Sequence, residues 1–376
     1  MRVGFYAPLK SPDHPIPSGD RQIARLFLAA LRLAGHEPSL ISRFRSYDGS
    51  GDLSRQARLA SVGERLAQSL VHSFLEAPQK SPELWFSYHV YHKAPDWLGP
   101  TIANALGIPY IVAEASLAPR QAFGPWALGH RAVERAVRRA DAVIGLNRAD
   151  RECVLPLLRH STTWVAFKPF LDANSYGREV RPSSGPLRLI VVAMMRYGDK
   201  LASYQILGDA LSRLLDLWWS LEVVGDGSAR GDVERALSIA KERIIWAGSL
   251  ADEAIAERLS AADICVWPAV NEALGMALLE AQASSLPVVA GASGGVAGIV
   301  ENGATGFLVT PGDPAAFAAA LRALMLDEKR RLAFGKAARK RVLREHDLSN
   351  AARRLATVID RLTRWELPQS MLQLPL

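Results

Sequence analysis

The chain has few of the features that mark secreted, metal-bound or membrane-spanning proteins. Only two of its 376 residues are cysteines, and Cys153 and Cys265 stand far apart in no metal-ligand pattern, so reduced thiols are expected. The longest uncharged stretch, 281–300, is interrupted by Pro287 and by several glycines, which suit a strand and a loop better than a membrane helix. The first apolar run ends at Pro8 and is shorter than the core of a secretory signal. We therefore expect a cytoplasmic protein with no transmembrane span.

Basic residues are in excess but unevenly distributed. The net charge is +7; residues 1–180 hold 22 basic and 16 acidic side chains, residues 181–328 hold 11 and 18, and residues 329–376 hold 12 and 4. Two basic ends suit an anionic partner such as a phospholipid surface or a phosphorylated acceptor. Solvated arginine-rich helix faces explain them equally well. Nucleic acid is disfavoured, because the basic segments lack interleaved aromatics and no zinc or RNA-binding signature occurs.

Strand and helix alternate in the first half. An apolar strand at 3–7 precedes a proline-rich loop, and a helix is predicted from about Asp20, with Ser18 or Asp20 as its cap and Gly35 near its end. Further strands are predicted at 84–88, 110–113 and 142–146. The stretch 177–186, rich in proline, serine and glycine, is interpreted as a linker.

A second alternating series follows, built on continuous apolar runs of the kind buried in parallel sheets. Its predicted strands are 187–193, 221–224, 244–246, 264–267, 287–290 and 307–309. At 49% hydrophobic and 22% charged residues, the chain is long enough for two cores. The predicted fold class is α/β, with two Rossmann-like doubly wound domains whose ligand loops lie at the carboxyl ends of the strands, across a cleft. The predicted boundaries are 1–180, 181–345 and a helical segment and tail at 346–376.

The most informative stretch is 271–281, in which Glu272 and Glu280 are eight residues apart with Gly275 and an apolar run between them. A helix is predicted from about Gly275, and eight helical residues would rise about 12 Å. A hydrolytic carboxylate pair works at roughly 5 to 9.5 Å across one bond, so this spacing suits an extended ligand held at two places. The alternative is a surface helix with two solvated glutamates.

Together with segments after it, this stretch resembles a known family. Residues 285–290, 293–295 and 303–309 follow it in the order typical of retaining glycosyltransferases of the GT-B fold, the group 1 or family 4 type with two glutamates eight residues apart. The resemblance covers most of the chain and is strongest from Arg188 to Asp327. It implies a C-terminal helix that returns to the first domain, a nucleoside diphosphate sugar (UDP- or GDP-sugar) as donor, and no required cofactor.

The resemblance assigns two separate roles to the glutamates. Glu272 lies beside the donor sugar and Glu280 accepts hydrogen bonds from the ribose hydroxyls, as ionised carboxylates do. Backbone amides near Leu274, Gly275 and Met276 would bind the diphosphate at a helix start, where free N–H groups and the helix dipole favour anions.

Other members of the donor site are carried over in the same way. Arg196 and Lys200, on the loop after the first strand of the second domain, would neutralise the diphosphate leaving group; solvated surface charge is the alternative. The turn at 225–227 allows close backbone packing near the nucleotide, and Ser249 and Leu250 would contact the base. No Asp-x-Asp triplet occurs, so no metal site is predicted.

The first domain departs from the family pattern. Only Gly19 remains of the glycine-rich turn that approaches the diphosphate. Where many relatives have a cleft histidine, this chain has Glu114, with Ser116 beside it, as a candidate to orient the sugar. His89 and His92 follow another predicted strand, and either is a candidate to contact donor or acceptor; a structural or merely exposed histidine is the alternative.

The predicted function is transfer of a sugar, with retention of configuration, to a hydroxyl of a glycan, glycolipid or small-molecule acceptor, in cell-surface polysaccharide or glycolipid synthesis. Two alternatives stay open: a nucleotide-sugar epimerase or hydrolase on the same fold, and a non-catalytic nucleotide-sugar-binding scaffold. Peripheral contact with the inner membrane face is left open too. The motifs fix neither the sugar, the base nor the acceptor.

Overall fold

The structure is a computed structural model that describes residues 1–16, 18–177 and 185–364. The chain divides into two compact units: unit 1 is Met1–Phe167 together with the chain from Leu348 onward, and unit 2 is Lys168–Asp347. Most of the predicted linker, 178–184, and the tail 365–376 lie outside the described residues. The chain thus passes between the units at Phe167 and again at Asp347.

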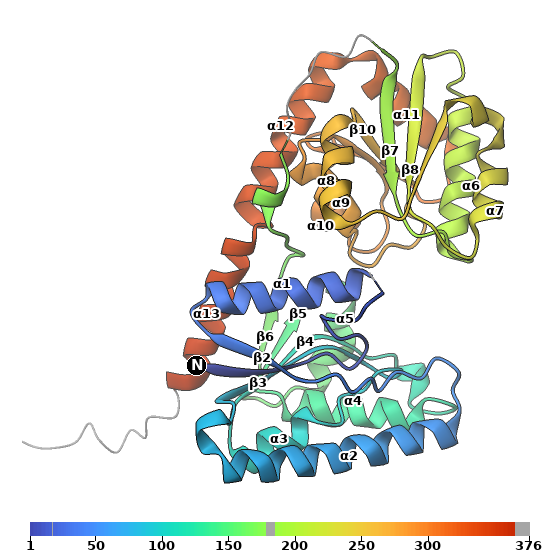
Figure 1. Cartoon of the computed structure of the whole chain (residues 1–376). Helices are drawn as coiled ribbons and strands as arrows, with labels where there is room; N and C mark the ends of the chain where they lie inside the picture. Colours follow the sequence, from blue (N-terminus) through green and yellow to red (C-terminus); the bar gives the residue numbers. More distant parts are fainter. Residues whose placement is uncertain (17, 178–184, 365–376) are drawn as a thin grey trace, which may run out of the picture. The chain divides into compact units, whose positions relative to one another are not determined.

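Unit 1 is built on a parallel sheet of six strands in the order β2-β1-β3-β4-β5-β6 (Figure 1). The strands are β1 (Arg2–Tyr6), β2 (Glu37–Ser42), β3 (Leu84–Tyr91), β4 (Tyr110–Ser116), β5 (Ala142–Gly145) and β6 (Thr163–Ala166). The predicted strands β1, β3, β4 and β5 are confirmed, whereas β2 and β6 were not predicted from the sequence. Both lie at the sheet edges, where strands are only partly buried and their apolar runs are short.

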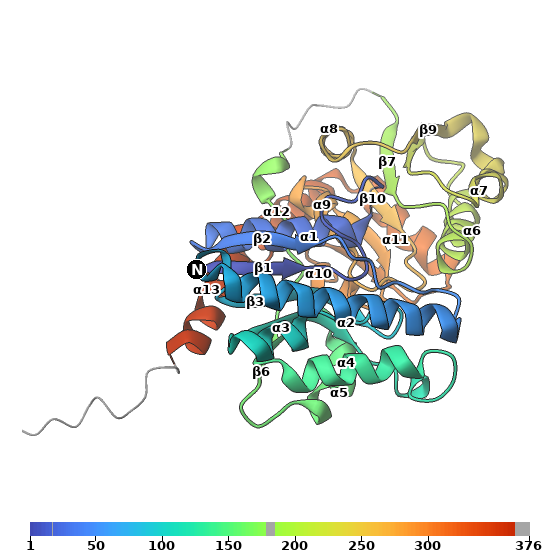
Figure 2. The ribbon, with the colours of Figure 1, turned by 60° about the horizontal axis from the view of Figure 1, so that its bottom comes forward.

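Helices cover both faces of this sheet (Figures 1 and 2). One face carries α1 (Gly19–Leu33), which packs against α13 (Leu348–Arg364). The other carries α2 (Leu53–Glu76), α3 (Gly99–Leu106) and α4 (Ala127–Arg139); the short α5 (Arg148–Val154) lies beside β4 and β5. The expected return of a C-terminal helix to the first domain is confirmed.

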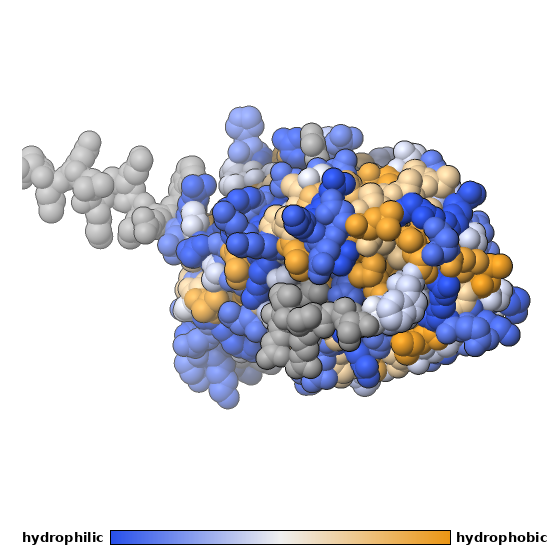
Figure 3. Space-filling model, turned by 90° about the horizontal axis from the view of Figure 1, so that it is seen from above, coloured by the Kyte–Doolittle hydropathy of each residue, from blue (hydrophilic) through white to orange (hydrophobic). Residues whose placement is uncertain are grey.

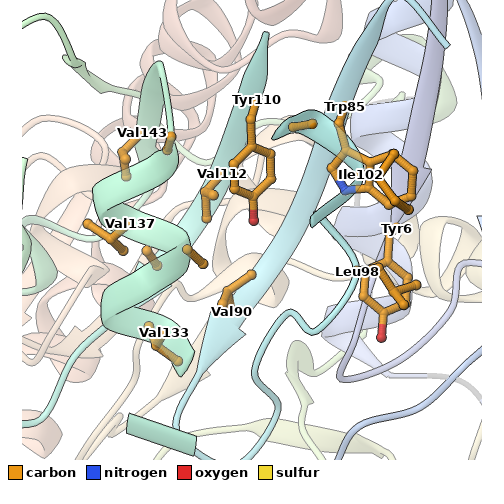
Figure 4. Packing of buried hydrophobic residues seen from close by; sticks show 14 of the residues in the cluster. Tyr6, Trp85, Val90, Leu98, Ile102, Tyr110, Val112, Val133, Val137 and Val143 are labelled. Carbon is orange, nitrogen blue, oxygen red and sulfur yellow. The ribbon is translucent and has the colours of Figure 1, made fainter. Parts of the chain in front are cut away.

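The core of unit 1 lies between the sheet and helices α2 to α4. Figure 4 shows the rings of Tyr6, Trp85 and Tyr110 packed among valines, leucine and isoleucine of this layer. The fully buried carboxylate of Asp96 accepts hydrogen bonds from the Tyr110 hydroxyl at 2.7 Å and from the backbone N–H groups of Leu98 and Gly99 at 2.8 Å. A buried charge with several donors is stable, and here it fixes the start of α3.

Unit 2 repeats the architecture with the strand order β12-β11-β10-β7-β8-β9. The strands are β7 (Leu187–Val192), β8 (Trp219–Val224), β9 (Ile244–Gly248), β10 (Ile264–Trp267), β11 (Val288–Gly291) and β12 (Gly306–Val309). All six were predicted. The central strands β10 and β11 are buried throughout and give uninterrupted apolar runs, and the edge strands β9 and β12 have short apolar runs although they are only partly buried.

The helices of unit 2 lie on both faces of its sheet. They are α6 (Asp199–Ser212), α7 (Arg230–Ala236), α8 (Asp252–Ala261), α9 (Met276–Ala283), α10 (Val296–Ile299), α11 (Pro314–Leu326) and α12 (Glu328–Glu345). Helices α7 and α11 pack on α6, whereas α8, α10 and α12 pack on α9. Parallel strands joined in this way bring all the loops that follow the strands to one edge of the sheet.

On the face shown in Figure 3, apolar patches are separated by hydrophilic groups. Within the described ranges, no helix has the length and apolarity needed to cross a bilayer.

Candidate functional site

Glu272 is held in a fixed turn at the carboxyl edge of the unit 2 sheet. Its backbone N–H donates to Ser293 Oγ at 3.1 Å, and its carbonyl accepts from Gly295 N at 3.0 Å. Ala269, at the start of the same turn, has a φ of +47°, a strained value for a residue with a side chain. The turn therefore depends on the loop after β11 for its shape.

The Glu272 carboxylate is fixed by two partners. Oε2 accepts a hydrogen bond from Lys200 Nζ at 2.5 Å and from Trp267 Nε1 at 3.1 Å. The Lys200 ammonium also lies 5.1 Å from the centre of the Trp267 ring, which packs edge-on against Tyr204 at 5.2 Å. The structure thus brings Glu272 and Lys200 together, as a half-buried ion pair on a rigid aromatic base.

Arg196 differs from Lys200. Its side chain is exposed on the loop between β7 and α6, and in the described part of the chain its guanidinium has no ion-pair partner. The loop itself is ordered by backbone hydrogen bonds, from Met195 N to Asp226 O and from Leu201 N to Arg196 O, both at 3.0 Å. Of the two predicted cations, therefore, Arg196 is the one free to bind an anion.

Helix α9 begins one residue after Gly275, as predicted. Gly275 is buried with a φ of +69°, and its carbonyl accepts from Leu278 N and Leu279 N. Leu274 and Met276 beside it are half-buried. The first N–H groups of α9 have no partner within the helix and favour an anion. The estimate of about 12 Å for eight helical residues does not apply, because Glu272 lies in the turn before the helix.

Glu280 lies on α9 and is half-buried. Desolvation, with a smaller contribution from the negative charge of Asp252, raises the pKa of Glu280 to about 8. Burial is the main cause that raises the pKa values of Tyr176 and Cys265, and the negative charge of Glu280 raises both further. In the described residues the Glu280 carboxyl has no hydrogen-bond donor, so it retains its full capacity to accept bonds from a ligand.

The remaining residues predicted from the sequence, Ser249, Leu250 and Gly19, also lie in segments that follow a strand. Ser249 is exposed and Leu250 half-buried, directly after β9. Gly19 is the first residue of α1 in unit 1, and a Cβ there would meet no atom within 4 Å, so packing within the chain does not require glycine. The predicted cap Ser18 accepts from Arg21 N at 3.3 Å.

In unit 1, Glu114 joins a cluster that the sequence only partly indicated. His89 Nδ1 lies 2.9 Å from Asp20 Oδ1, a pair that was not predicted. Glu114 is 8% exposed, its Oε2 makes no hydrogen bond of ordinary geometry, and the same holds for the hydroxyl of Tyr88. Burial raises the pKa of Glu114, partly offset by the charge of His89. In the same cluster, burial raises the pKa of Asp150, and a hydrogen bond from Ser116 partly offsets this rise.

A shared backbone distortion creates this cluster. Tyr88 pairs with Ala113 and Val90 with Ala115, so His89 and Glu114 stand opposite each other, and both have a left-handed φ of about +60°. Each such residue costs about 1–3 kcal/mol. Two neighbouring strands are therefore strained at one rung.

The distortion changes which side chains face the core. Before the rung, Trp85 and Val112 point toward helices α2 to α4, and after it Val90 does so (Figure 4). Ala115 belongs to the same buried cluster. Regular alternation would place Val90 and Ala115 on the α1 face. His89 is thereby turned toward Asp20 on α1. Strain of this kind, maintained at polar residues, is typical of functional sites.

A glycine substitution tests the turn that holds Glu272. Gly294 has a φ of +50°, and a Cβ would lie 2.0 Å from the carbonyl oxygen of Glu272. Gly294→Ala is therefore expected to displace the turn and lower the midpoint of thermal unfolding by several degrees. Gly298→Ala is the matched control, because a Cβ there meets nothing within 4 Å. Equal unfolding temperatures for the two variants would contradict the assigned role of Gly294.

The two doubly wound sheets define the GT-B class of fold. The chain superposes on the crystal structure of HepE from Anabaena in complex with UDP with a TM-score of 0.73, at 18% identity, covering 96% of this chain and 100% of that chain. At this identity the likeness shows the fold alone, and the predicted fold class is confirmed.

Sequence comparison relates part of the chain to a known family. Residues 190–341 match the family described as glycosyl transferases group 1. The chain is 32% identical over 170 residues to sulfoquinovosyl transferase SQD2 of Arabidopsis thaliana, covering 44% of this chain and 32% of that protein. It is 33% identical over 181 residues to a D-inositol 3-phosphate glycosyltransferase of Corynebacterium kroppenstedtii, covering 45% of this chain and 40% of that protein. The chain thus spans less than half the length of these relatives, and its similarity to the group 1 glycosyltransferases lies in residues 190–341 of the C-terminal unit.

Proposed function

We propose that this protein is a retaining glycosyltransferase that moves a sugar from a nucleoside diphosphate sugar, UDP- or GDP-linked, to an acceptor hydroxyl. The observation that carries the proposal is the grouping of Glu272, Lys200 and the start of α9 at one sheet edge, with Arg196 exposed on a neighbouring loop. The match to the group 1 family and the UDP-bound structure of similar fold support it.

In the proposed mechanism the protein positions groups and stabilises charge. The bond between the anomeric carbon and the leaving phosphate oxygen breaks, and the acceptor oxygen bonds to the same face of that carbon. The leaving phosphate takes the acceptor proton. Arg196 and the free N–H groups of α9 stabilise the negative charge that develops on the diphosphate, and Glu272, with Lys200 as its partner, accepts hydrogen bonds from the sugar. The proposed mechanism includes no divalent metal.

A ligand panel tests the donor assignment. Thermal unfolding would be measured with UDP, GDP, ADP and their sugars, and at equal concentration the ligand that binds more tightly would raise the unfolding temperature more. Donor consumption is then followed with and without candidate acceptors. An epimerase or hydrolase would consume the donor without an acceptor, whereas a scaffold would bind it and leave it intact. Either result would replace the transferase assignment.

We place the reaction in glycolipid or cell-surface polysaccharide synthesis on the cytoplasmic side of a membrane, with α12 as a candidate contact to anionic lipid. This helix carries eight Lys and Arg residues between 329 and 344. Flotation with anionic liposomes at low and high salt tests the contact, and absence of binding at both would remove it.

The raised pKa of Glu280 predicts that the stability of the protein depends on pH. Because its pKa is about 8, folded Glu280 keeps a proton between about pH 4.5 and 8 that the unfolded chain has lost, so stability falls as the pH rises through this range. Glu280→Gln removes the buried charge. Its stability relative to wild type is expected to rise from pH 5 to pH 9, as measured by thermal unfolding.

Nucleotide affinity is expected to rise with pH, whereas the stability of the wild-type protein falls. Ribose hydroxyls donate to the ionised carboxylate, so binding favours loss of the proton, and wild-type affinity is expected to increase from pH 7 to pH 9. Titration calorimetry with the nucleotide identified by the panel would measure it. Glu280→Gln should bind more weakly and with a flat profile. A variant that binds as tightly as wild type at pH 9 would contradict the ribose contact.

A further inference from the structure

A cavity of about 250 Å³ lies between the edge strand β6 and helix α13, both of which belong to unit 1. Its strand wall is formed by Thr163, Trp164 and Val165, and its helix wall by side chains between Arg354 and Leu362. All the described residues that line it lie in these two elements, so the loops that follow the strands do not take part. The volume is just below the range of about 300–1,000 Å³ that is typical of small-molecule sites. The cavity therefore has room for a small molecule at a place separate from the candidate site.

Apolar side chains form the inner part of the cavity. Val358 is only 8% exposed, and Val165 and Leu362 are half-buried. Trp164 is held in place, because its ring fills the space beside Gly145, where a Cβ would lie 2.2 Å from the ring. An apolar group that enters would leave water and contact these side chains, which is favourable. The cavity thus offers an apolar surface that is already shaped by the packing of the unit.

Two arginines give the cavity its charge. Arg354 and Arg361 are exposed and lie about two turns apart on α13. Arg354 is fixed, because its guanidinium donates to the carbonyl oxygen of Ala166 at 2.5 Å and lies 4.8 Å from the centre of the Phe167 ring. Arg361 donates no hydrogen bond within the described residues, and neither arginine has a carboxylate there within ion-pair distance. The positive charge at the cavity is therefore not neutralised by the part of the chain that the structure describes.

We propose that this cavity binds an anionic amphiphile, a molecule that joins an apolar chain to a phosphate or carboxylate group. The chain would lie against Val165 and Val358, and the anionic group would bond to Arg361. A sugar lacks the apolar part and an inorganic anion makes no use of the apolar surface, whereas a cation would be repelled by both arginines. The proposal does not rest on the proposed function.

The two walls of the cavity are also the segments through which the chain leaves and re-enters unit 1. Strand β6 leads to the pass after Phe167, and α13 begins at Leu348, directly after the second pass. A ligand in contact with both walls would hold these two segments together. Amide hydrogen exchange in β6 and α13 is therefore expected to slow when the ligand binds, while exchange in α9 stays unchanged.

Calorimetry with the full chain tests the two-part ligand. Octyl phosphate, below the concentration at which it forms micelles, would be compared with octanol and with inorganic phosphate. It is expected to bind about tenfold or more tightly than either. Arg361→Ala should reduce the gain over octanol to less than about twofold. Arg353→Ala is the matched control, because Arg353 is an exposed arginine of the same helix that bonds to Asn350 and does not line the cavity.

A variant that fills the cavity locates the site. Thr163 is exposed at the start of β6, where a large aromatic residue is compatible with a strand. Thr163→Trp should keep the unfolding temperature of the free protein and weaken binding of octyl phosphate by about tenfold or more. A saturating nucleoside diphosphate should not displace octyl phosphate from the wild-type protein, because the donor site lies in unit 2.

Flotation distinguishes the source of the amphiphile. Vesicles of phosphatidylcholine, with and without phosphatidic acid, would be tested with wild type and Thr163→Trp. Loss of binding to the acidic vesicles in the variant would identify a membrane lipid as the ligand. Unchanged flotation, together with the loss of octyl phosphate binding, would identify a free amphiphile.

The proposal is overturned if octyl phosphate binds no more tightly than octanol, if Arg353→Ala and Arg361→Ala lose the gain equally, or if the nucleoside diphosphate displaces the probe. Unchanged binding in Thr163→Trp would also overturn it. A failure of the proposed function would look different. In that case no nucleotide sugar would be bound or consumed, while octyl phosphate binding and its dependence on Arg361 would remain.

Discussion

Replacing Glu272 with alanine is expected to abolish sugar transfer, by at least about a hundredfold in kcat, while nucleotide affinity falls by less than it does in Arg196→Ala. The carboxylate is the acceptor for Lys200 Nζ at 2.5 Å and for Trp267 Nε1 at 3.1 Å. Its removal takes away the proposed sugar contact and also leaves a half-buried ammonium without its partner. The nucleotide contacts assigned to Arg196 and Glu280 do not involve it.

Glu272→Gln is the matched control for this prediction. Glutamine has nearly the same size and can still accept from Trp267, so the turn should keep its shape and the unfolding temperature should change little. Transfer should nevertheless be strongly reduced, because the charge that pairs with Lys200 is gone. Equal transfer rates for wild type and Glu272→Ala, measured by product formation with saturating donor, would rule out the assigned role.

The residues of the proposed donor site could be chosen from the sequence because they lie in local segments. Glu272, Gly275 and Glu280 lie within nine residues, and the buried strands before them give unbroken apolar runs. The sequence does not show which cation forms an ion pair within the protein. Arg196 and Lys200 were predicted as an equivalent pair of cations, yet the structure places Lys200 on Glu272 and leaves Arg196 exposed.

The first-domain cluster could be predicted only in part, because its members meet through the fold. Asp20 and His89 are 69 residues apart, and the hydrogen bond between them depends on a left-handed residue in β3. Left-handed φ at a histidine and a glutamate has no sequence signature, since such values are ordinarily the mark of glycine. The polar run at the end of β3 indicated a site, but the reversal of side-chain alternation could not be foreseen.

Strained backbone occurs near the candidate site of each unit. Among the described residues, four that are not glycine have a positive φ: His89, Glu114, Ala269 and Ser285. The first two lie at the carboxyl ends of β3 and β4, and Ala269 lies just after β10 in the turn that holds Glu272. Strain of this kind persists only where surrounding structure enforces it. Its position at the ligand edge of both sheets supports a functional site in each unit.

Arg196→Ala is expected to have the second large effect, and a different one from Glu272→Ala. The exposed guanidinium is the unpaired cation of the donor loop, so its loss should weaken nucleoside diphosphate binding by about tenfold or more and also lower kcat. A nucleoside monophosphate should be affected less, since it lacks the second phosphate. Binding of both nucleotides by calorimetry, together with transfer rates, measures the difference.

Arg213→Ala provides the control for Arg196→Ala. Arg213 is an exposed arginine at the opposite end of α6, so its removal changes the net charge equally but not the charge at the donor loop. If long-range attraction alone accounted for nucleotide affinity, both variants would bind more weakly by the same factor, and the difference would vanish at high salt. A loss confined to Arg196→Ala and persisting at high salt would instead require direct contact with the diphosphate. Because Lys200 is already paired with Glu272, no other cation of this loop can replace Arg196, and Arg196→Lys should restore only part of the binding.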